Sequence, residues 1–173
     1  MPNASADKCW KGVWAYGLGV QGAWAELSQL GLKITEAAET DAYFLSQGVN
    51  VKVISGDNPQ TVGAIARQAG VPGADHPYDA RYLPENMDEV AEVLATTHVF
   101  GRVTPAQKRD MIDALQARGK IVAMTGDGVN DVLALKNADL GIAMGSGSDA
   151  TRAVAQLVLL DDQWEMMPDV VAQ

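Results

Sequence analysis

The chain has 173 residues, of which 47% are hydrophobic, which suits one domain with an apolar core and argues against a disordered chain. Its formal net charge of -9 disfavours nucleic acid as a partner, because binding to a phosphate backbone needs basic patches. Cys9 is the only cysteine, so the chain cannot form an internal disulfide. No apolar stretch reaches the roughly 20 residues that a membrane-spanning helix needs.

The first part of the chain, residues 1–34, sustains neither the period of a strand nor that of a helix, and we assign no element to it. The pattern becomes regular from Glu36. A helix is expected first, ending at Gly48, and a short valine-rich strand follows it. Asn58 and Pro59 then start a second helix, because asparagine caps the first turn and the missing N–H of proline has no helical partner.

Strands and helices alternate over the rest of the chain. We expect strands at 49–54, 98–101, 121–124, 140–143 and 157–160, helices at 36–47, 59–69, 86–94, 105–118, 131–137 and 149–156, a loop at 72–84 and a tight turn at 126–130. This alternation predicts an α/β fold, a doubly wound parallel sheet with helices on both faces. Residues 35–173 are expected to form one incomplete domain, and residues 1–34 an unassigned N-terminal segment.

Three polar clusters follow three of the expected strands. They are Ser55-Gly56-Asp57, the run from Thr104 to Lys108, and the run from Thr125 to Asp131. Since ligands of such sheets bind beyond the carboxyl ends of the strands, we expect the clusters to converge at one edge. Ser55 stands beside the N–H groups of a helix start, a natural seat for phosphate, and Lys108 adds a cation. Asp127 and Asp131 suggest Mg²⁺, which prefers oxygen ligands and shares them with phosphates.

Each cluster taken alone has a simpler interpretation. The Ser55 cluster is typical of an ordinary strand-to-helix turn, and a lone lysine such as Lys108 is usually solvated. Asp131 alone would serve to complement a helix dipole. The run from Gly145 to Asp149 looks like a phosphate loop, but a flexible turn followed by a helix cap is the simpler interpretation.

The clusters read together point to a known family. A hinge motif is matched by the residues from Thr125 to Asp131 and continues from Ala138 to Gly145. A lysine motif is matched from Arg102 to Lys108. A phosphate-binding loop is matched from Val53 to Asn58, with serine where many members have threonine. In these motifs the chain resembles the phosphorylation domain of P-type cation-transporting ATPases, which belong to the haloacid dehalogenase superfamily. The resemblance covers about residues 36–173.

The resemblance implies that an aspartate attacks the γ-phosphate of ATP and becomes an aspartyl phosphate, while Mg²⁺ neutralises the developing charge. It implies catalytic roles for Lys108, which would hold the phosphate against the aspartate, and for Ser55. Phosphate and nucleotide binding would involve Ser55, Gly56, Asp57, Arg102, Lys108 and Asn130. The metal residues would be Asp127 as a ligand and Asp131 in support.

The same resemblance implies ATP or phosphate as a ligand and Mg²⁺ as a cofactor. In a full-length parent it also implies a transported cation, further pump domains and membrane helices. The domain would then lie at the cytoplasmic face of the cell membrane, whereas the isolated chain would be soluble and cytoplasmic.

The chain departs from the family at the nucleophile, which lies in an Asp-Lys-Thr-Gly-Thr run at the end of an apolar strand. Its only Asp-Lys pair is Asp7-Lys8, and the residues before this pair do not resemble a strand. We therefore interpret the chain as a pump fragment, or the remnant of a damaged pump gene, without its nucleophile. Two alternatives are a soluble phosphatase of the same superfamily and a non-catalytic phosphate- or metal-binding module.

Overall fold

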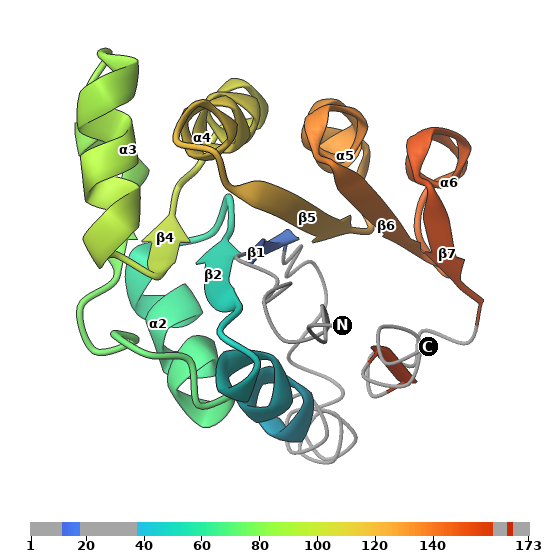
Figure 1. The fold of residues 1–173 in the computed structure, drawn as a ribbon, viewed down its shortest axis with the longest axis horizontal. Helices are drawn as coiled ribbons and strands as arrows, with labels where there is room; N and C mark the ends of the chain where they lie inside the picture. The colour runs from blue at the N-terminus through green and yellow to red at the C-terminus, as the bar shows by residue number, and fades with distance from the viewer. Residues whose placement is uncertain (1–11, 18–37, 161–165, 168–173) are drawn as a thin grey trace, which may run out of the picture.

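The computed structural model describes residues 12–17, 38–160 and 166–167. Within these residues, seven parallel strands form one sheet in the order β3-β4-β2-β1-β5-β6-β7 (Figure 1). The strands are β1 (Gly12–Gly17), β2 (Asn50–Ile54), β3 (Tyr78–Asp79), β4 (Val99–Gly101), β5 (Ile121–Gly126), β6 (Leu140–Met144) and β7 (Leu157–Leu159). The helices are α2 (Pro59–Gln68), α3 (Met87–Thr96), α4 (Pro105–Ala117), α5 (Val132–Asn137) and α6 (Asp149–Val154), with short 3-10 turns η1 (Ala80–Tyr82) and η2 (Val129–Asp131). Residues 38–46 are also helical.

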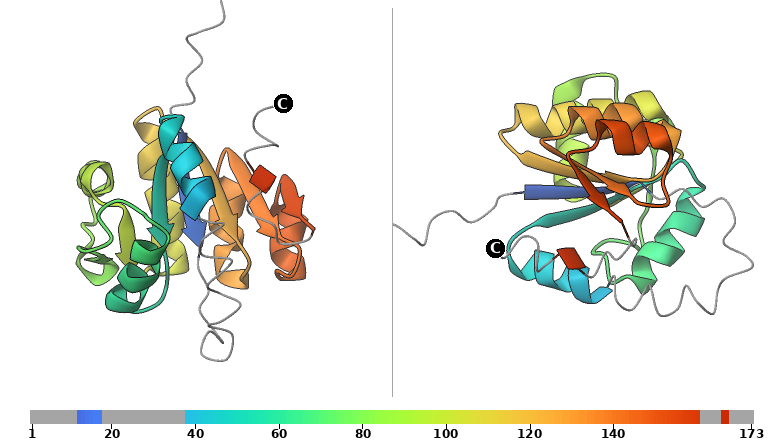
Figure 2. Two further views of the ribbon diagram at one scale, coloured as in Figure 1. Left: turned by 90° about the horizontal axis from the view of Figure 1, so that it is seen from below. Right: turned by 90° about the vertical axis from the view of Figure 1, so that its right-hand side faces the viewer.

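Helices cover both faces of the sheet, as predicted. The helices α3, α4, α5 and α6 lie over one face, and α2 and the helix of residues 38–46 lie over the other (Figures 1 and 2). Each layer has its own apolar core. The first contains Leu94, Met111 and Leu135, and the second contains Phe44 and Val62. The doubly wound α/β fold is therefore confirmed.

The strand β1 occupies the middle of the sheet and pairs in parallel with β2 on one side and β5 on the other. Gly17 is in register with Ile54, and Tyr16 is in register with Thr125. The strand lies inside the segment 1–34, to which the sequence analysis assigned no element. It begins and ends with glycine and lies in a segment that sustains no period, so only the pairing with both neighbours identifies it.

The loop expected at residues 72–84 is wrong in part, because β3 and η1 lie inside it. β3 has only two residues, and it is defined by the pairing of Tyr78 with Phe100 and of Asp79 with Gly101. A strand this short has no detectable period. The other expected elements are present, with ends that differ by a few residues. α3 runs on to Thr96, and the tight turn expected at 126–130 gives way to the last residue of β5 and to η2.

No helix in the described part of the chain combines the length and the apolar character needed to cross a membrane.

The buried lysine Lys52 links the sheet to the end of α3. It lies in the middle of β2 with 1% of its surface exposed, and its Nζ donates to the carbonyl oxygens of Leu94, at 2.5 Å, and Thr97, at 2.8 Å. These two carbonyls lie at the C-terminal end of the helix, where carbonyls lack helical partners and cations are favourable. Burial lowers the pKa of Lys52 to about 8.

This lowered pKa predicts that the stability of the fold rises with pH between about 8 and 10.5. In that window the unfolded chain still carries the proton on Lys52, whereas the folded chain has lost it, so raising the pH favours folding. The slope contributed by Lys52 is at most about 1.4 kcal/mol per pH unit. Urea unfolding of the parent and of Lys52→Met over this pH range measures the effect. Equal slopes for the two proteins would contradict the assignment.

Candidate functional site

Ser55 follows β2 directly and is fully buried at the start of the turn that leads into α2. Its Oγ accepts a hydrogen bond from the backbone N of Asp57 at 3.2 Å and lies 3.3 Å from Asp57 Oδ2, to which it donates. Asn58 ends the turn as the helix cap, since its Oδ1 accepts from Gln60 N at 2.9 Å. The predicted phosphate-binding residues Ser55, Gly56 and Asp57 are thus brought together at the N-terminus of a ten-residue helix, where N–H groups favour an anion.

Lys108 and Asp131 form a buried ion pair. Lys108 Nζ lies 2.6 Å from Asp131 Oδ1, and the side chains are 6% and 4% exposed. The backbone positions the lysine through a capping box at the start of α4, in which Thr104 and Gln107 bind each other's backbone N–H groups. The second carboxylate oxygen of Asp131 accepts from Gly128 N at 3.3 Å. Asp131 therefore orients the Lys108 side chain.

Asp127 follows β5 and is half-buried, while Asn130 is exposed in η2. The loop that carries Asp127 is tied to the next crossover, because its carbonyl oxygen accepts from Ser148 N at 2.9 Å. Ser148 also caps α6 by accepting from Thr151 N. The run from Gly145 to Asp149 is accordingly a turn and a helix cap, as the simpler interpretation had it.

The position of Asp131 depends on a glycine at the end of β5. A Cβ built on Gly126 would lie 2.6 Å from Cβ and 2.8 Å from Cγ of Asp131, whereas a Cβ on Gly128 would meet nothing closer than 3.6 Å. Real Cβ atoms are not found at the shorter distances. Gly126 therefore lets the Asp131 carboxylate fold back over the strand end.

The site lies where the chain order of the sheet reverses. The chain runs from β1 to β2, continues to β3 at the outer edge and comes back to β4. It then crosses to the other side of β1 for β5, β6 and β7. Ser55 and Asp127 stand at the carboxyl ends of the two strands that flank β1, about 10 Å apart across the sheet at the usual strand spacing. Ligands of doubly wound sheets bind in the crevice at this point.

The carboxylates near this site suit Mg²⁺ only if a phosphate supplies further oxygen ligands. No group of three or more histidine, cysteine, aspartate or glutamate side chains gathers around a metal position in the part of the chain that the structure describes. Mg²⁺ is held in many phosphate-binding sites by one or two carboxylates plus phosphate oxygens and water. Asp127 is the carboxylate at the end of β5 that such a site would use, and Asp131 is engaged by Lys108 and by Gly128 N.

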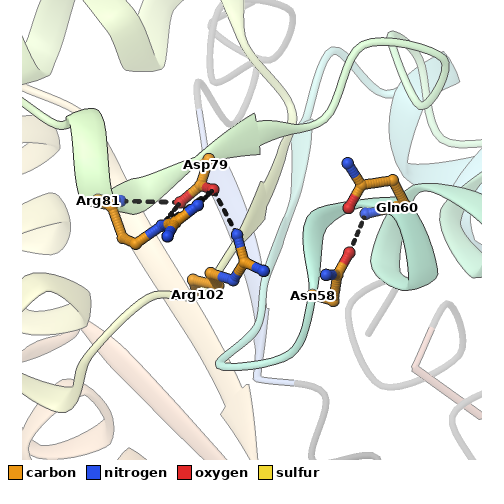
Figure 3. A network of polar contacts seen from close by, with 5 residues as sticks. All are labelled: Asn58, Gln60, Asp79, Arg81 and Arg102. Carbon is orange, nitrogen blue, oxygen red and sulfur yellow. Dashed lines mark hydrogen bonds and ion pairs between the residues drawn. The ribbon is translucent and has the colours of Figure 1, made fainter.

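Arg102 lies one strand further out, at the end of β4, and its backbone N donates to Asp57 O at 2.7 Å. Its side chain pairs with Asp79 at 2.8 Å (Figure 3). The sequence analysis did not anticipate Asp79, because the residue lies in the region expected to be a loop. Asp7, the aspartate of the one Asp-Lys pair, lies outside the described residues.

Comparison with known proteins decides the family. The model of the haloacid dehalogenase-like hydrolases matches residues 21–139. The chain belongs to this family. This match begins at residue 21, so the central strand β1 lies before the matched region.

The resemblance to P-type cation-transporting ATPases is also confirmed. The chain is 58% identical over 138 residues to the calcium-transporting ATPase CtpE of Mycolicibacterium smegmatis and 44% identical over 135 residues to the probable cation-transporting ATPase exp7 of Streptococcus pneumoniae. These matches cover 80% and 78% of this chain but only 17% of each relative. The chain therefore corresponds to a part of such proteins.

Solved structures agree with this assignment. A zinc-transporting PIB-type ATPase in the E2P state superposes with a TM-score of 0.60 at 26% identity, over 79% of this chain and 18% of the other. The catalytic domain of the CPx-ATPase CopB-B has a TM-score of 0.61 at 22% identity, over 81% and 44% of the two chains, and at this identity it supports the fold alone.

The buried ion pair predicts strongly non-additive mutations. Lys108→Met leaves the Asp131 carboxylate buried without its cation and should cost about 3–5 kcal/mol of stability, and Asp131→Leu should cost a similar amount. The double variant should lose much less than the sum, because no unpaired charge remains. Urea unfolding of the four proteins gives the coupling energy. Additive losses would show that the two groups do not depend on each other.

Alanine substitutions at Gly126 and Gly128, two positions apart, provide a test with its own control. Gly126→Ala should destabilise the chain by about 1–3 kcal/mol, because the new methyl group must displace Asp131. Gly128→Ala should change stability by less than about 1 kcal/mol, since its Cβ has room and its φ of -96° suits alanine. Unfolding midpoints measure both. An equal effect of the two substitutions would contradict the packing argument.

Proposed function

We propose that the site binds a phosphate group together with Mg²⁺, as the phosphate- and metal-binding part of the phosphorylation domain of an ATP-driven cation pump. The observation that carries this proposal is the placement of Ser55 and Asp127 at the carboxyl ends of the two strands beside β1, with Lys108 held close by through Asp131. A hydroxyl, a cation, a helix N-terminus and a carboxylate suit a phosphate with its metal ion.

Each residue has a definite role in this proposal. The Ser55 hydroxyl and the N–H groups of the 55–57 turn would bind phosphoryl oxygens, joined by Asn130 from the opposite side. Lys108 would supply positive charge, and Asp131 would keep its Nζ in place. Asp127 would hold Mg²⁺, which neutralises charge on the phosphate when bound. Arg102 and Asp57 would lie beside the nucleotide.

In a longer parent protein, this region would serve ATP hydrolysis through an aspartyl phosphate, coupled to the movement of a cation by other domains and membrane helices. The domain that contains residues 35–173 would then work at the cytoplasmic face of the membrane. The chain spans 17% of the length of the mycobacterial relatives that it matches, so this role belongs to the parent.

One observation favours the non-catalytic module for the chain as given. β1 fills the central position between Ser55 and Asp127, where a strand ending in a nucleophilic aspartate would stand in the family reaction. The residues that follow β1 in the sequence, Leu18 to Ala25, include no aspartate or glutamate. The site would then bind phosphate beside a strand that offers no carboxylate to attack it.

Binding is tested by NMR titration of the full chain with inorganic phosphate, with and without Mg²⁺. We expect shifts in the 55–57 turn and around Asp127, and weaker binding when either component is omitted. Asp127→Ala should remove the dependence on Mg²⁺, whereas Asp88→Ala, which removes an exposed carboxylate in the first turn of α3, should not. A parent chain that binds no phosphate, or an Asp127→Ala variant that behaves like the parent, would refute the proposal.

Covalent chemistry is tested separately. After incubation with ATP and Mg²⁺ and an acid quench, we expect no hydroxylamine-labile phosphoenzyme, because the central strand presents no carboxylate. A labelled product that disappears in Asp7→Asn would make Asp7 the nucleophile. A product that survives this substitution would assign the chemistry to another carboxylate, and either result would overturn the non-catalytic module.

A further inference from the structure

Arg102 has a backbone conformation that side chains rarely adopt. Its φ is +55°, and it is the one non-glycine residue with a positive φ in the described part of the chain. The four other described residues with positive φ are glycines, at positions 48, 70, 73 and 119. Residues held in such conformations are concentrated at functional sites, because the surrounding structure must compensate for the strain. Glycine would suit the turn at position 102 better than arginine, so we ask what the arginine side chain contributes.

The backbone around Arg102 is tied to the proposed phosphate-binding turn. Arg102 N donates to Asp57 O at 2.7 Å, and Val103 N donates to Ser55 O at 2.9 Å. Gly101 permits this approach, because a Cβ there would lie 2.5 Å from Pro59 Cα. These contacts place the backbone of Arg102 beside the 55–57 turn, at the same edge of the sheet.

Asp79 holds the Arg102 guanidinium. Its Oδ2 accepts from Arg102 Nη1 at 2.8 Å, and its side chain is 17% exposed. The same carboxylate accepts from Arg81 Nη2 at 2.7 Å and caps η1 by accepting from Arg81 N at 3.1 Å (Figure 3). Hydrogen bonds from Arg81, with a smaller contribution from Arg102, keep the pKa of Asp79 well below its usual range, so the carboxylate stays charged.

The pairing leaves part of Arg102 available to a ligand. Only Nη1 has a hydrogen-bond partner among the described residues, and the side chain is 37% exposed. In Figure 3 the other terminal nitrogen points away from Asp79, to the side on which Asn58 and the start of α2 lie. A guanidinium is always charged, and its free N–H groups can donate charge-assisted hydrogen bonds to an anion.

We propose that Asp79 is a positioning residue, which orients Arg102 so that its free guanidinium nitrogens meet a phosphate-bearing ligand held at the 55–57 turn. This inference rests on the proposed phosphate site and adds to it a residue from β3, two strands away from β2. Arg81 shares the carboxylate but is bonded to it more fully, through Nε as well as Nη2, and serves as the natural control.

The experiment compares phosphate binding and stability in matched variants of the full chain. Arg102→Gly removes the guanidinium but suits the positive φ, so it should bind inorganic phosphate roughly three- to tenfold more weakly while its urea midpoint stays unchanged or rises. Asp79→Ala and the closer replacement Asp79→Asn should weaken binding in the same direction. The double variant Arg102→Gly/Asp79→Ala should bind no more weakly than Arg102→Gly alone. Arg81→Ala should bind as the parent does.

ATP serves as a second probe, to separate a phosphate from a nucleotide. A loss with both ligands assigns Arg102 to the phosphate group, and a loss with ATP alone assigns it to the nucleotide; both support the positioning role. If Arg102→Gly binds both phosphate and ATP as the parent does, while Ser55→Ala binds them more weakly, this inference is overturned and the phosphate site is left standing. A further loss on adding Asp79→Ala to Arg102→Gly would also overturn it, since Asp79 would then act by another route. A parent that binds neither ligand would refute the phosphate site itself.

Discussion

The pairing of β1 with both of its neighbours is the constraint on which the rest of the structure depends. β2 and β5 are not paired with each other, so β1 alone joins the strands β3, β4 and β2 to the strands β5, β6 and β7. Parallel pairing also brings the carboxyl ends of β2 and β5 to the same edge, with Ser55 on one side and Asp127 on the other. The site exists because a short strand from the start of the chain closes the gap between two halves.

The same strand lies between the residues that we propose to bind phosphate, Ser55 and Asp127. It lies ahead of the region that matches the haloacid dehalogenase-like hydrolases, and the sequence after it offers no carboxylate until Glu26. The positions of the proposed binding residues are set by β2, β4, β5 and the helices that follow them. The proposed binding site and the central strand therefore come from different parts of the sequence.

Paired charged side chains give this site its geometry. Lys108 lies in an apolar surrounding only because Asp131 compensates its charge, and Asp131 reaches it only because Gly126 has no side chain. On the other side of the site, the strained backbone at Arg102 is held by Asp57 and its side chain by Asp79. Lys108 and Arg102 thus each have a carboxylate partner that fixes the direction of the side chain. Such preorganisation would lower the entropic cost of binding a ligand.

The sequence by itself determined the alternation of strands and helices, the family, and the residues at the carboxyl ends of β2 and β5, because these depend on local apolar runs, caps and motifs. The cap at Asn58 and the capping box at Thr104 are local interactions, and residues within four positions are sufficient to form them. Only the tertiary structure decided the place of β1, the existence of β3 and the partnership of Asp79 with Arg102. β1 lies in a segment without a sustained period and β3 has only two residues, and both are identified as strands only by the distant segments that pair with them. Asp79 and Arg102 are 23 positions apart in the sequence and meet because β3 lies beside β4, a contact that no local pattern records.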